Sequence, residues 1–365
     1  MRTIYTSCLM TIAALAVATS CGKSDTPTAA SGPVDVRLVV SSGNNTRVGS
    51  DATDNDIRQL RVYAFNADGE KVGYAEANSL RGQNYIPITL SEDGKINFYV
   101  IANANFGPRP KVDTTSVTDW TSLSKTDLES LKFDLSGFTG WSATDDFVSP
   151  MSNNLKDEFG NDLENNNAYS DTVTVTKPTV IPVTVQHVLG RLRLMLNKES
   201  DDVTITLKRA AVYNRPDYFL LYNSGSADIE YEKNESLVDS LVDEFVVSDI
   251  PLETTQKEVA RTYLAPNLYG SSDPNTYTAQ KTDGTTSNGL NKAYCLELTV
   301  EFAYTTGTSE IKETKYYTVY LPRVPRNTSI DVQGTFKGTV VDIKPTFNIM
   351  VNAWVERPID IPAFE

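Results

Sequence analysis

Cys21 is the residue whose chemistry the surrounding sequence defines most clearly. It follows one arginine, an apolar stretch from about Leu9 to Ala18 and several small residues, a pattern typical of a lipoprotein export signal. The apolar stretch is about half as long as a helix that crosses a bilayer. The sequence therefore predicts a signal peptide over residues 1–20 and attachment of fatty acid, such as palmitate, at Cys21.

A second site of expected chemistry is Arg47, which ends a polar segment, Ser41–Thr46. An arginine in an exposed polar turn is accessible to an arginine-specific protease. Upstream of it, apolar residues alternate with other residues, which places them on one face of a β-strand. These apolar residues are Val34, Val36, Leu38 and Val40. We therefore predict a propeptide over residues 21–47 that contains a whole removable strand.

Other side chains that could support catalysis or metal binding are few. His187 is the single histidine, so no Ser–His or Cys–His nucleophile pair is identified, and strand alternation around it predicts a structural role. Two acidic clusters, Asp51–Asp56 and Asp157–Asp162, lack the turn glycine and terminal glutamate of an EF-hand loop. The sequence thus predicts a protein that is not an enzyme and has neither a metal site nor a cofactor.

The charge and the cysteine content restrict the partners of the chain. Its 33 bases and 47 acids give a net charge of −14 at pH 7, which repels nucleic-acid backbones and anionic lipid head groups. We therefore expect no nucleic acid partner, and membrane attachment only through the lipid on Cys21. Cys8 lies in the signal peptide and Cys21 is expected to carry the lipid, so no disulfide is expected within the chain. Strand alternation predicts that Cys295 is a buried structural thiol.

Short alternating apolar runs, separated by clusters of Gly, Asn, Asp and Pro, recur along the chain and predict an all-β fold. Examples are Leu60–Phe65, Ile96–Ala102, Arg191–Leu196 and Val203–Leu207. The chain length fits two domains, and prolines at 178 and 182 interrupt the pattern. We predict an N-terminal β-sandwich domain over 48–180 and a C-terminal one over 181–365, with one short helix, opened by a Ser or Thr cap, between Leu123 and Leu131.

The order of these features closely resembles the major fimbrial subunit (fimbrillin, type V pilin) family of Bacteroidales. In the first half, the resemblance rests on the lipid-attachment signal, the strand Val34–Val40, Arg47, the acidic turn after it and the strand Ile57–Phe65. Motifs further along the chain that match the family are Arg191–Leu194, Tyr263–Asn267, Val324–Thr328 and Asn352–Val355. The resemblance spans nearly the whole chain.

This resemblance implies two transthyretin-like antiparallel β-sandwich domains in tandem. It also implies export as a lipoprotein to the cell outer membrane, removal of the first strand by an arginine-specific protease that cuts after Arg47, and polymerisation with other fimbrial subunits by strand donation. The mature protein would then be a structural subunit of a cell-surface fimbria, or pilus, that supports cell adhesion.

A candidate donor strand lies at the end of the chain, at about residues 356–365. Ile359, Ile361 and Ala363 share one face at a period of two, which matches the pleat of a sheet. Pro358 and Pro362 have the opposite parity and lack an N–H group for the ladder. Two interpretations stay open: the tail is donated to a partner, or it is a final strand that completes its own sheet and then frays.

Two further functional hypotheses compete with a stalk subunit. The chain is alternatively a tip, accessory or anchor subunit of the same kind of fimbria, and processing at Arg47 separates these, because an anchor should keep its lipid. A third alternative is a non-catalytic, glycan-binding surface lipoprotein. Glycan binding would require clustered aromatic residues, whereas Trp120, Trp141 and Trp354 are far apart in the sequence.

Overall fold

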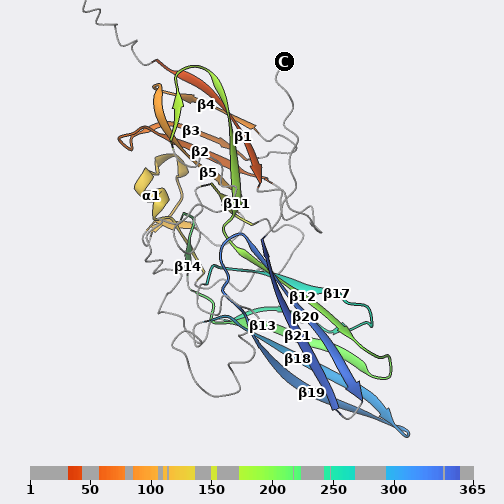
Figure 1. The fold of residues 1–365 in the computed structure, drawn as a ribbon. Helices are drawn as coiled ribbons and strands as arrows, with labels where there is room; N and C mark the ends of the chain where they lie inside the picture. Colours follow the sequence, from red (N-terminus) through yellow and green to blue (C-terminus); the bar gives the residue numbers. More distant parts are fainter. Residues whose placement is uncertain are drawn as a thin grey trace, which may run out of the picture.

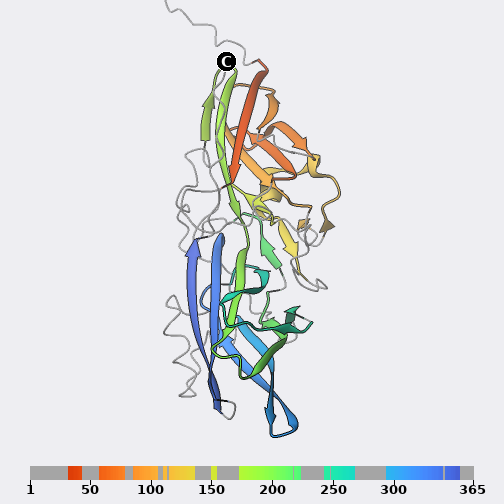
Figure 2. The ribbon, with the colours of Figure 1, turned by 90° about the vertical axis from the view of Figure 1, so that its right-hand side faces the viewer.

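The computed structural model is built almost entirely of β-strands (Figures 1 and 2), which confirms the predicted all-β class. The residues that the structure describes are 32–42, 57–78, 85–105, 110–112, 115–135, 149–153, 172–216, 218–222, 242–246, 248–267, 293–339 and 342–353. No helix in this part of the chain is long and apolar enough to cross a membrane. The transthyretin-like topology of each half stays a prediction.

The N-terminal half forms one sheet that folds over a single apolar core. Its strands are β1 (Val34–Ser42), β2 (Leu60–Phe65), β3 (Lys71–Ala77), β4 (Tyr85–Leu90), β5 (Gly94–Ala102), β9 (Met151–Ser152), β10 (Thr172–Val175) and β11 (Thr179–His187). They follow the order β3-β2-β5-β9-β11-β1-β4, and β10 pairs with β5. The two ends of this path approach each other, since the Ser91 N–H donates to the Val72 carbonyl at 2.8 Å. A side chain at Gly73 would come within 3.0 Å of Ile88 and Leu90, so glycine permits this close approach.

The C-terminal half consists of two sheets with a second apolar core between them. The first contains β12 (Gly190–Lys198), β17 (Lys257–Leu264), β20 (Thr328–Thr339) and β21 (Asp342–Ala353) in the order β17-β12-β20-β21. The second contains β13 (Thr204–Tyr213), β15 (Val242–Val246), β18 (Cys295–Thr306) and β19 (Ser309–Tyr320) in the order β15-β13-β18-β19, and β16 (Ile250–Pro251) pairs with β13. Alternate residues of both sheets face inward, as in Leu192, Leu194 and Leu196 of β12.

A smaller layer lies beside the junction of the two halves. It contains β6 (Pro110–Val112), β7 (Thr115–Ser116), β8 (Lys132–Asp134), β14 (Tyr218–Leu220), the 3-10 helix η1 (Trp120–Ser122) and helix α1 (Lys125–Glu129). The predicted short helix is confirmed: the Asp127 N–H donates to the Ser124 hydroxyl, and the Ser124 N–H donates to the Asp127 carboxylate, which is a capping box with aspartate at its third position. A third apolar cluster, which includes Leu128 and Tyr263, joins this layer to both halves.

The boundary expected between residues 180 and 181 falls inside β11. This strand pairs with β1 and β9, and its Ile181, Val183 and Val185 belong to the N-terminal core. The first strand of the C-terminal half starts at Gly190. The structure therefore places the junction about eight residues later than expected, because Pro182 lies within a strand and does not end one.

Candidate functional site

The candidate functional site is the groove between β4 and β11, which β1 fills. β1 is antiparallel to β4, with pairs from Val34–Leu90 to Val39–Tyr85. It is parallel to β11, with pairs from Val36–Thr179 to Ser42–Val185. Since β1 is the partner of both strands along this stretch (Figure 1), its departure would leave two unpaired sheet edges that face each other.

The inward face of β1 is apolar and buried. Val34, Val36, Leu38 and Val40 expose 7%, 3%, 0% and 1% of their surface. The walls around them are Ile86, Ile88 and Leu90 of β4 and Ile181, Val183 and Val185 of β11, and all belong to the same core. Complete burial of a side chain of this size contributes about 1.5–3 kcal/mol, so the four residues together contribute on the order of 10 kcal/mol.

The outward face of β1 makes polar contacts with the same two neighbours. The Thr89 hydroxyl donates to the Asp35 carboxylate at 2.7 Å, and the Arg37 guanidinium lies 3.5 Å from the centroid of the Tyr85 ring. Toward β11, the hydroxyl oxygens of Ser41 and Thr184 are 3.4 Å apart. A slip of one residue would turn these side chains into the core, so both faces specify one register.

Both walls of the groove contain a proline opposite β1. Pro87 of β4 faces Arg37, and Pro182 of β11 faces Val39. Because Pro87 has no N–H, the Arg37–Pro87 pair is of the type without hydrogen bonds, and the ladder bonds to β4 come from its neighbours in register. The missing N–H of Pro87 therefore costs β1 no bond.

Several residues predicted to matter lie outside the described part of the chain. They are the lipid-attachment residue Cys21, the processing site Arg47 and the tail residues Ile359, Ile361 and Ala363. The acidic clusters Asp51–Asp56 and Asp157–Asp162 and two of the tryptophans, Trp141 and Trp354, lie outside it as well. Their roles stay predictions.

The residues considered for catalysis are part of the packed interior. His187 is fully buried in β11, where it pairs with Met151, and Cys295 is buried at the start of β18, as predicted. Trp120 is buried, so it offers no exposed ring to a sugar. Within the described ranges, no group of three His, Cys, Asp or Glu side chains is placed to hold a metal ion.

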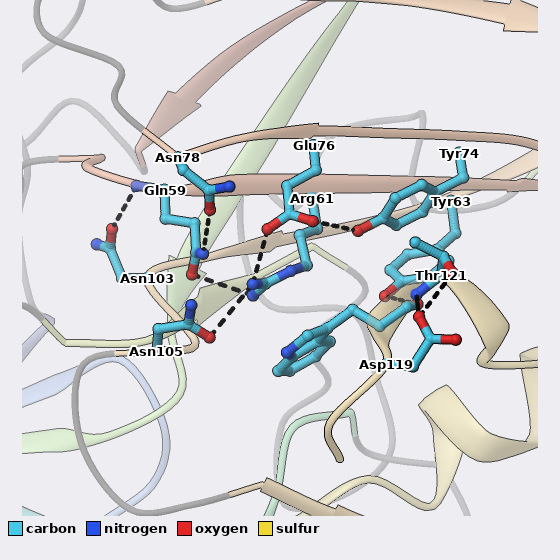
Figure 3. A network of polar contacts seen from close by, with 11 residues as sticks. Gln59, Arg61, Tyr63, Tyr74, Glu76, Asn78, Asn103, Asn105, Asp119 and Thr121 are labelled. Carbon is cyan, nitrogen blue, oxygen red and sulfur yellow. Dashed lines mark hydrogen bonds and ion pairs between the residues drawn. The ribbon is translucent and has the colours of Figure 1, made fainter.

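A buried network of polar contacts around Arg61 was not predicted (Figure 3). Arg61 of β2 donates to Gln59 at 3.0 Å, to Glu76 of β3 at 2.9 Å and to Asn105 at 3.2 Å. Glu76 also accepts a hydrogen bond from Tyr74 at 2.7 Å, and burial together with this bond raises the pKa of Tyr74. The sequence signal that could have indicated it is the arginine within the apolar run Leu60–Phe65. The structure shows that this strand is fully buried. The network links β2 to β3 through Arg61 and Glu76.

The chain is similar in sequence to one protein family and in structure to several solved proteins. Residues 33–209 match the model of the family described as major fimbrial subunit protein (FimA), which confirms the resemblance seen in the sequence. A search of the curated proteins found no match to this chain.

Solved structures share the fold at low sequence identity. A candidate cell adhesion protein of Bacteroides eggerthii has 14% identity and a TM-score of 0.55, and the match covers 91% of this chain and 99% of that one. A second candidate cell adhesion protein, from Parabacteroides distasonis, has 11% identity, a TM-score of 0.52 and coverages of 89% and 97%. The tip fimbrial protein Mfa3 of Porphyromonas gingivalis, truncated at its C-terminus, has 14% identity, a TM-score of 0.50 and coverages of 88% and 100%.

Proposed function

We propose that this chain, which belongs through its residues 33–209 to the major fimbrial subunit family, is a structural fimbrial subunit that assembles by exchanging its first strand for the strand of another subunit. The observation that carries the proposal is the position of β1, buried on its inner face and flanked by β4 and β11. Loss of such a strand would expose an apolar groove with two open edges, which an extended segment of a partner fills by β-augmentation.

The processing that frees the groove follows from the residues around β1. Cys21 would anchor the precursor to the outer membrane through its lipid, and an arginine-specific protease would cut after Arg47, beyond the end of β1. The cut converts β1 from a covalently attached strand into a separate peptide, so its high effective concentration at the groove is lost. Mature subunits would then join a fimbria on the cell surface and support adhesion.

A tip, accessory or anchor role in the same fimbria is the second candidate function. The likeness to the tip protein Mfa3 shows a shared fold, and the position in the fibre depends on which ends of the subunit are used. A stalk subunit both loses β1 and donates a strand. A tip subunit only accepts one, and an anchor keeps its lipid. We infer no enzymatic activity and no cofactor for any of these roles.

The direct test is processing at Arg47. Filaments sheared from the cell surface should yield a subunit whose N-terminal sequence starts at Val48. Arg47→Ala should leave a membrane-bound monomer. Arg47→Lys keeps the charge and should behave in the same way if the protease is specific for arginine. Polymer ladders from Arg47→Ala that resist mild denaturant would exclude strand removal as the assembly step.

Lipidation is tested separately with Cys21→Ala. This change should abolish labelling of the precursor by a fatty-acid analogue and release the chain from the membrane fraction. Undiminished labelling would show that Cys21 is not the acylated residue.

A further inference from the structure

We propose that the open edge of β19 is a docking surface for a second copy of this chain, and that the two β19 strands pair antiparallel about a two-fold axis at Thr314. The inference goes beyond the proposed function, because it concerns the C-terminal half and requires neither a cut at Arg47 nor the removal of β1. It names an interaction surface, the partner that fits it and the register of the contact.

β19 is the last strand of its sheet, and one of its edges is open. It pairs with β18 along its whole length, from Cys295–Tyr320 to Thr306–Ser309. In the described part of the chain, no strand pairs with its other edge. β19 lies at the outer border of the C-terminal half (Figure 1), and residues 309–314 are all exposed. A long edge with unpaired backbone groups is a template for another strand.

This edge strand also carries two exposed apolar side chains. Ile311 is 36% exposed, and Tyr316 is 78% exposed, the highest value among the exposed large apolar residues of the described chain. The inner face of β19 is marked by Tyr317, whose ring packs against Phe336. Because side chains alternate along a strand, Ile311 lies on this inner face and Tyr316 on the outer one. A strand paired with the edge would cover both.

The charges of β19 restrict which strand can pair with it. Glu310, Lys312, Glu313 and Lys315 are two acids and two bases, so the edge is locally neutral although the whole chain has a net charge of −14. Charged side chains on an edge strand usually prevent pairing, because an unrelated strand leaves them without partners. A second copy of β19 offers the opposite charges in the right register.

Like charges exclude most of the symmetric registers. Two identical antiparallel strands related by a two-fold axis place one residue opposite itself. The overlap is longest when this residue is Thr314 or Lys315. Lys315 or Glu313 on the axis sets two like charges directly opposite each other, which is destabilising. Tyr316 on the axis sets Glu313 opposite Val319, which is buried. The register with Thr314 on the axis has neither conflict.

In this register the inner faces of the two strands are complementary. Glu313 lies opposite Lys315 of the second copy, and the axis repeats this ion pair. Within one strand, Lys315 Nζ already lies 3.7 Å from a Glu313 carboxylate oxygen, so the two copies form a group of four alternating charges. Ile311 lies opposite Tyr317 of the second copy, which gives an aliphatic–aromatic cross-strand pair on each side of the axis.

The outer faces are complementary in the same register. Lys312 lies opposite Tyr316 of the second copy, where the ammonium group and the exposed ring can form a cation–π contact. Glu310 lies opposite Thr318, and the two Thr314 side chains meet at the axis as a threonine pair. Every directly opposed pair from Glu310 to Thr318 therefore has a suitable partner.

Disulfide trapping in the full-length precursor tests the pairing. A covalent trap suits a contact made by one pair of strands, which is smaller than a typical stable interface. In the proposed register the two Thr314 Cα atoms are about 4.5–5.5 Å apart, within the range of a disulfide. We expect Thr314→Cys to give a dimer on non-reducing gels that disappears on reduction. Cys8→Ser and Cys21→Ala in the same chain leave the buried Cys295 as its one native thiol.

The matched controls are Lys312→Cys and Tyr316→Cys, on the same exposed face of β19. In the proposed register each of these cysteines lies about 14 Å along the strands from its own copy, so each variant alone should give at least about tenfold less dimer than Thr314→Cys. An equimolar mixture of the two controls should recover the dimer, because residue 312 of one copy lies opposite residue 316 of the other. A stronger dimer from either control alone would overturn the register.

A charge exchange tests the contact between the copies. In the Thr314→Cys chain, Glu313→Lys sets lysines opposite lysines and Lys315→Glu sets acids opposite acids, so each variant alone should lose the dimer about tenfold. An equimolar mixture of the two variants restores opposite charges between the copies, while each chain keeps like charges within its own strand. The dimer should therefore return in the mixture. A mixture that stays monomeric would overturn the register.

These outcomes are separate from those of strand donation, because β1 stays in place and Arg47 stays uncut throughout. If Thr314→Cys gives no more dimer than its two controls at every protein concentration, the pairing of β19 is overturned and the proposed function is left intact. A chain that is not processed at Arg47 but forms the Thr314→Cys dimer would overturn the proposed function and support the pairing of β19.

Discussion

The guanidinium of Arg61 lies over the ring of Trp120, with its Cζ atom 4.1 Å from the ring centroid. Arg61 belongs to β2 and Trp120 to η1, so this contact joins the N-terminal sheet to the layer beside the junction of the two halves. The Tyr63 hydroxyl reinforces the same connection by donating to the Trp120 carbonyl at 2.8 Å. β2 therefore contributes one face to the N-terminal core and uses the other to position the layer beside the junction.

Arg61→Met should lower the free energy of unfolding by about 2–3 kcal/mol. The change removes a buried cation and leaves Glu76 without its ion-pair partner. Glu76 is a quarter exposed, so water compensates part of the loss. Urea unfolding followed by circular dichroism measures the effect. Lys95→Met, at an exposed position of β5, is the control and should change stability by less than about 0.5 kcal/mol. Equal effects of the two substitutions would contradict the structural role of Arg61.

Leu38→Ala should destabilise the uncleaved precursor by about 2–5 kcal/mol, because it opens a cavity in the N-terminal core. Val39→Ala, on the half-exposed face of the same strand, is the matched control and should cost less than about 1 kcal/mol. Thermal unfolding of the two precursors gives the comparison. If Val39→Ala were as damaging as Leu38→Ala, the inward face of β1 would not be the one that holds the strand in place.

Ser124→Ala should destabilise the layer beside the junction by about 1 kcal/mol, since it removes the side-chain cap of α1. Hydrogen bonds from Ser124 lower the pKa of Asp127, so this contribution is present above the ordinary pKa of an aspartate and is lost as the pH falls below it. Hydrogen exchange of the α1 amides at pH 7 and at pH 3 measures both effects. Ser122→Ala is the control, and identical exchange in the two variants at pH 7 would contradict the cap.

Sequence patterns predicted those elements that depend only on residues close together in the chain. The alternation of Val34, Val36, Leu38 and Val40 predicted β1 and its buried face. The expectation of a Ser or Thr cap predicted the short helix, and the structure shows that Ser124 is this cap. The junction was misplaced because Pro182 suggests a break, whereas β11 tolerates it opposite Val39.

Contacts between distant residues could not be predicted in this way. Arg61 meets Glu76, Asn105 and Trp120, which are 15, 44 and 59 positions away in the chain. Nothing in their local sequence shows that they converge. The outer-face contacts of β1 are of the same kind, since the partner of Asp35 is 54 residues away. Side chains that select a register therefore emerge only once the strands are paired.

Buried tyrosines should make the protein sensitive to alkali. Burial raises the pKa of Tyr63, Tyr99 and Tyr222, and the hydrogen bond that Tyr99 donates to Glu129 at 2.5 Å adds to the effect at Tyr99. In the unfolded chain these phenols lose their protons near pH 10, whereas the folded state keeps them. The unfolded state then binds fewer protons, so the contribution of these tyrosines to stability is constant below pH 10 and falls above it.

Each buried phenol contributes a slope of about 1.4 kcal/mol per pH unit above pH 10. Tyr99→Phe should therefore make the fall in unfolding free energy between pH 10 and 11.5 shallower by about this amount, although it loses one hydrogen bond at neutral pH. Urea titrations at several pH values measure the slope. Tyr316→Phe, at a position that is 78% exposed, is the control and should leave the slope unchanged. Parallel curves for Tyr99→Phe and the parent chain would show that Tyr99 ionises in the folded state as readily as in the unfolded one.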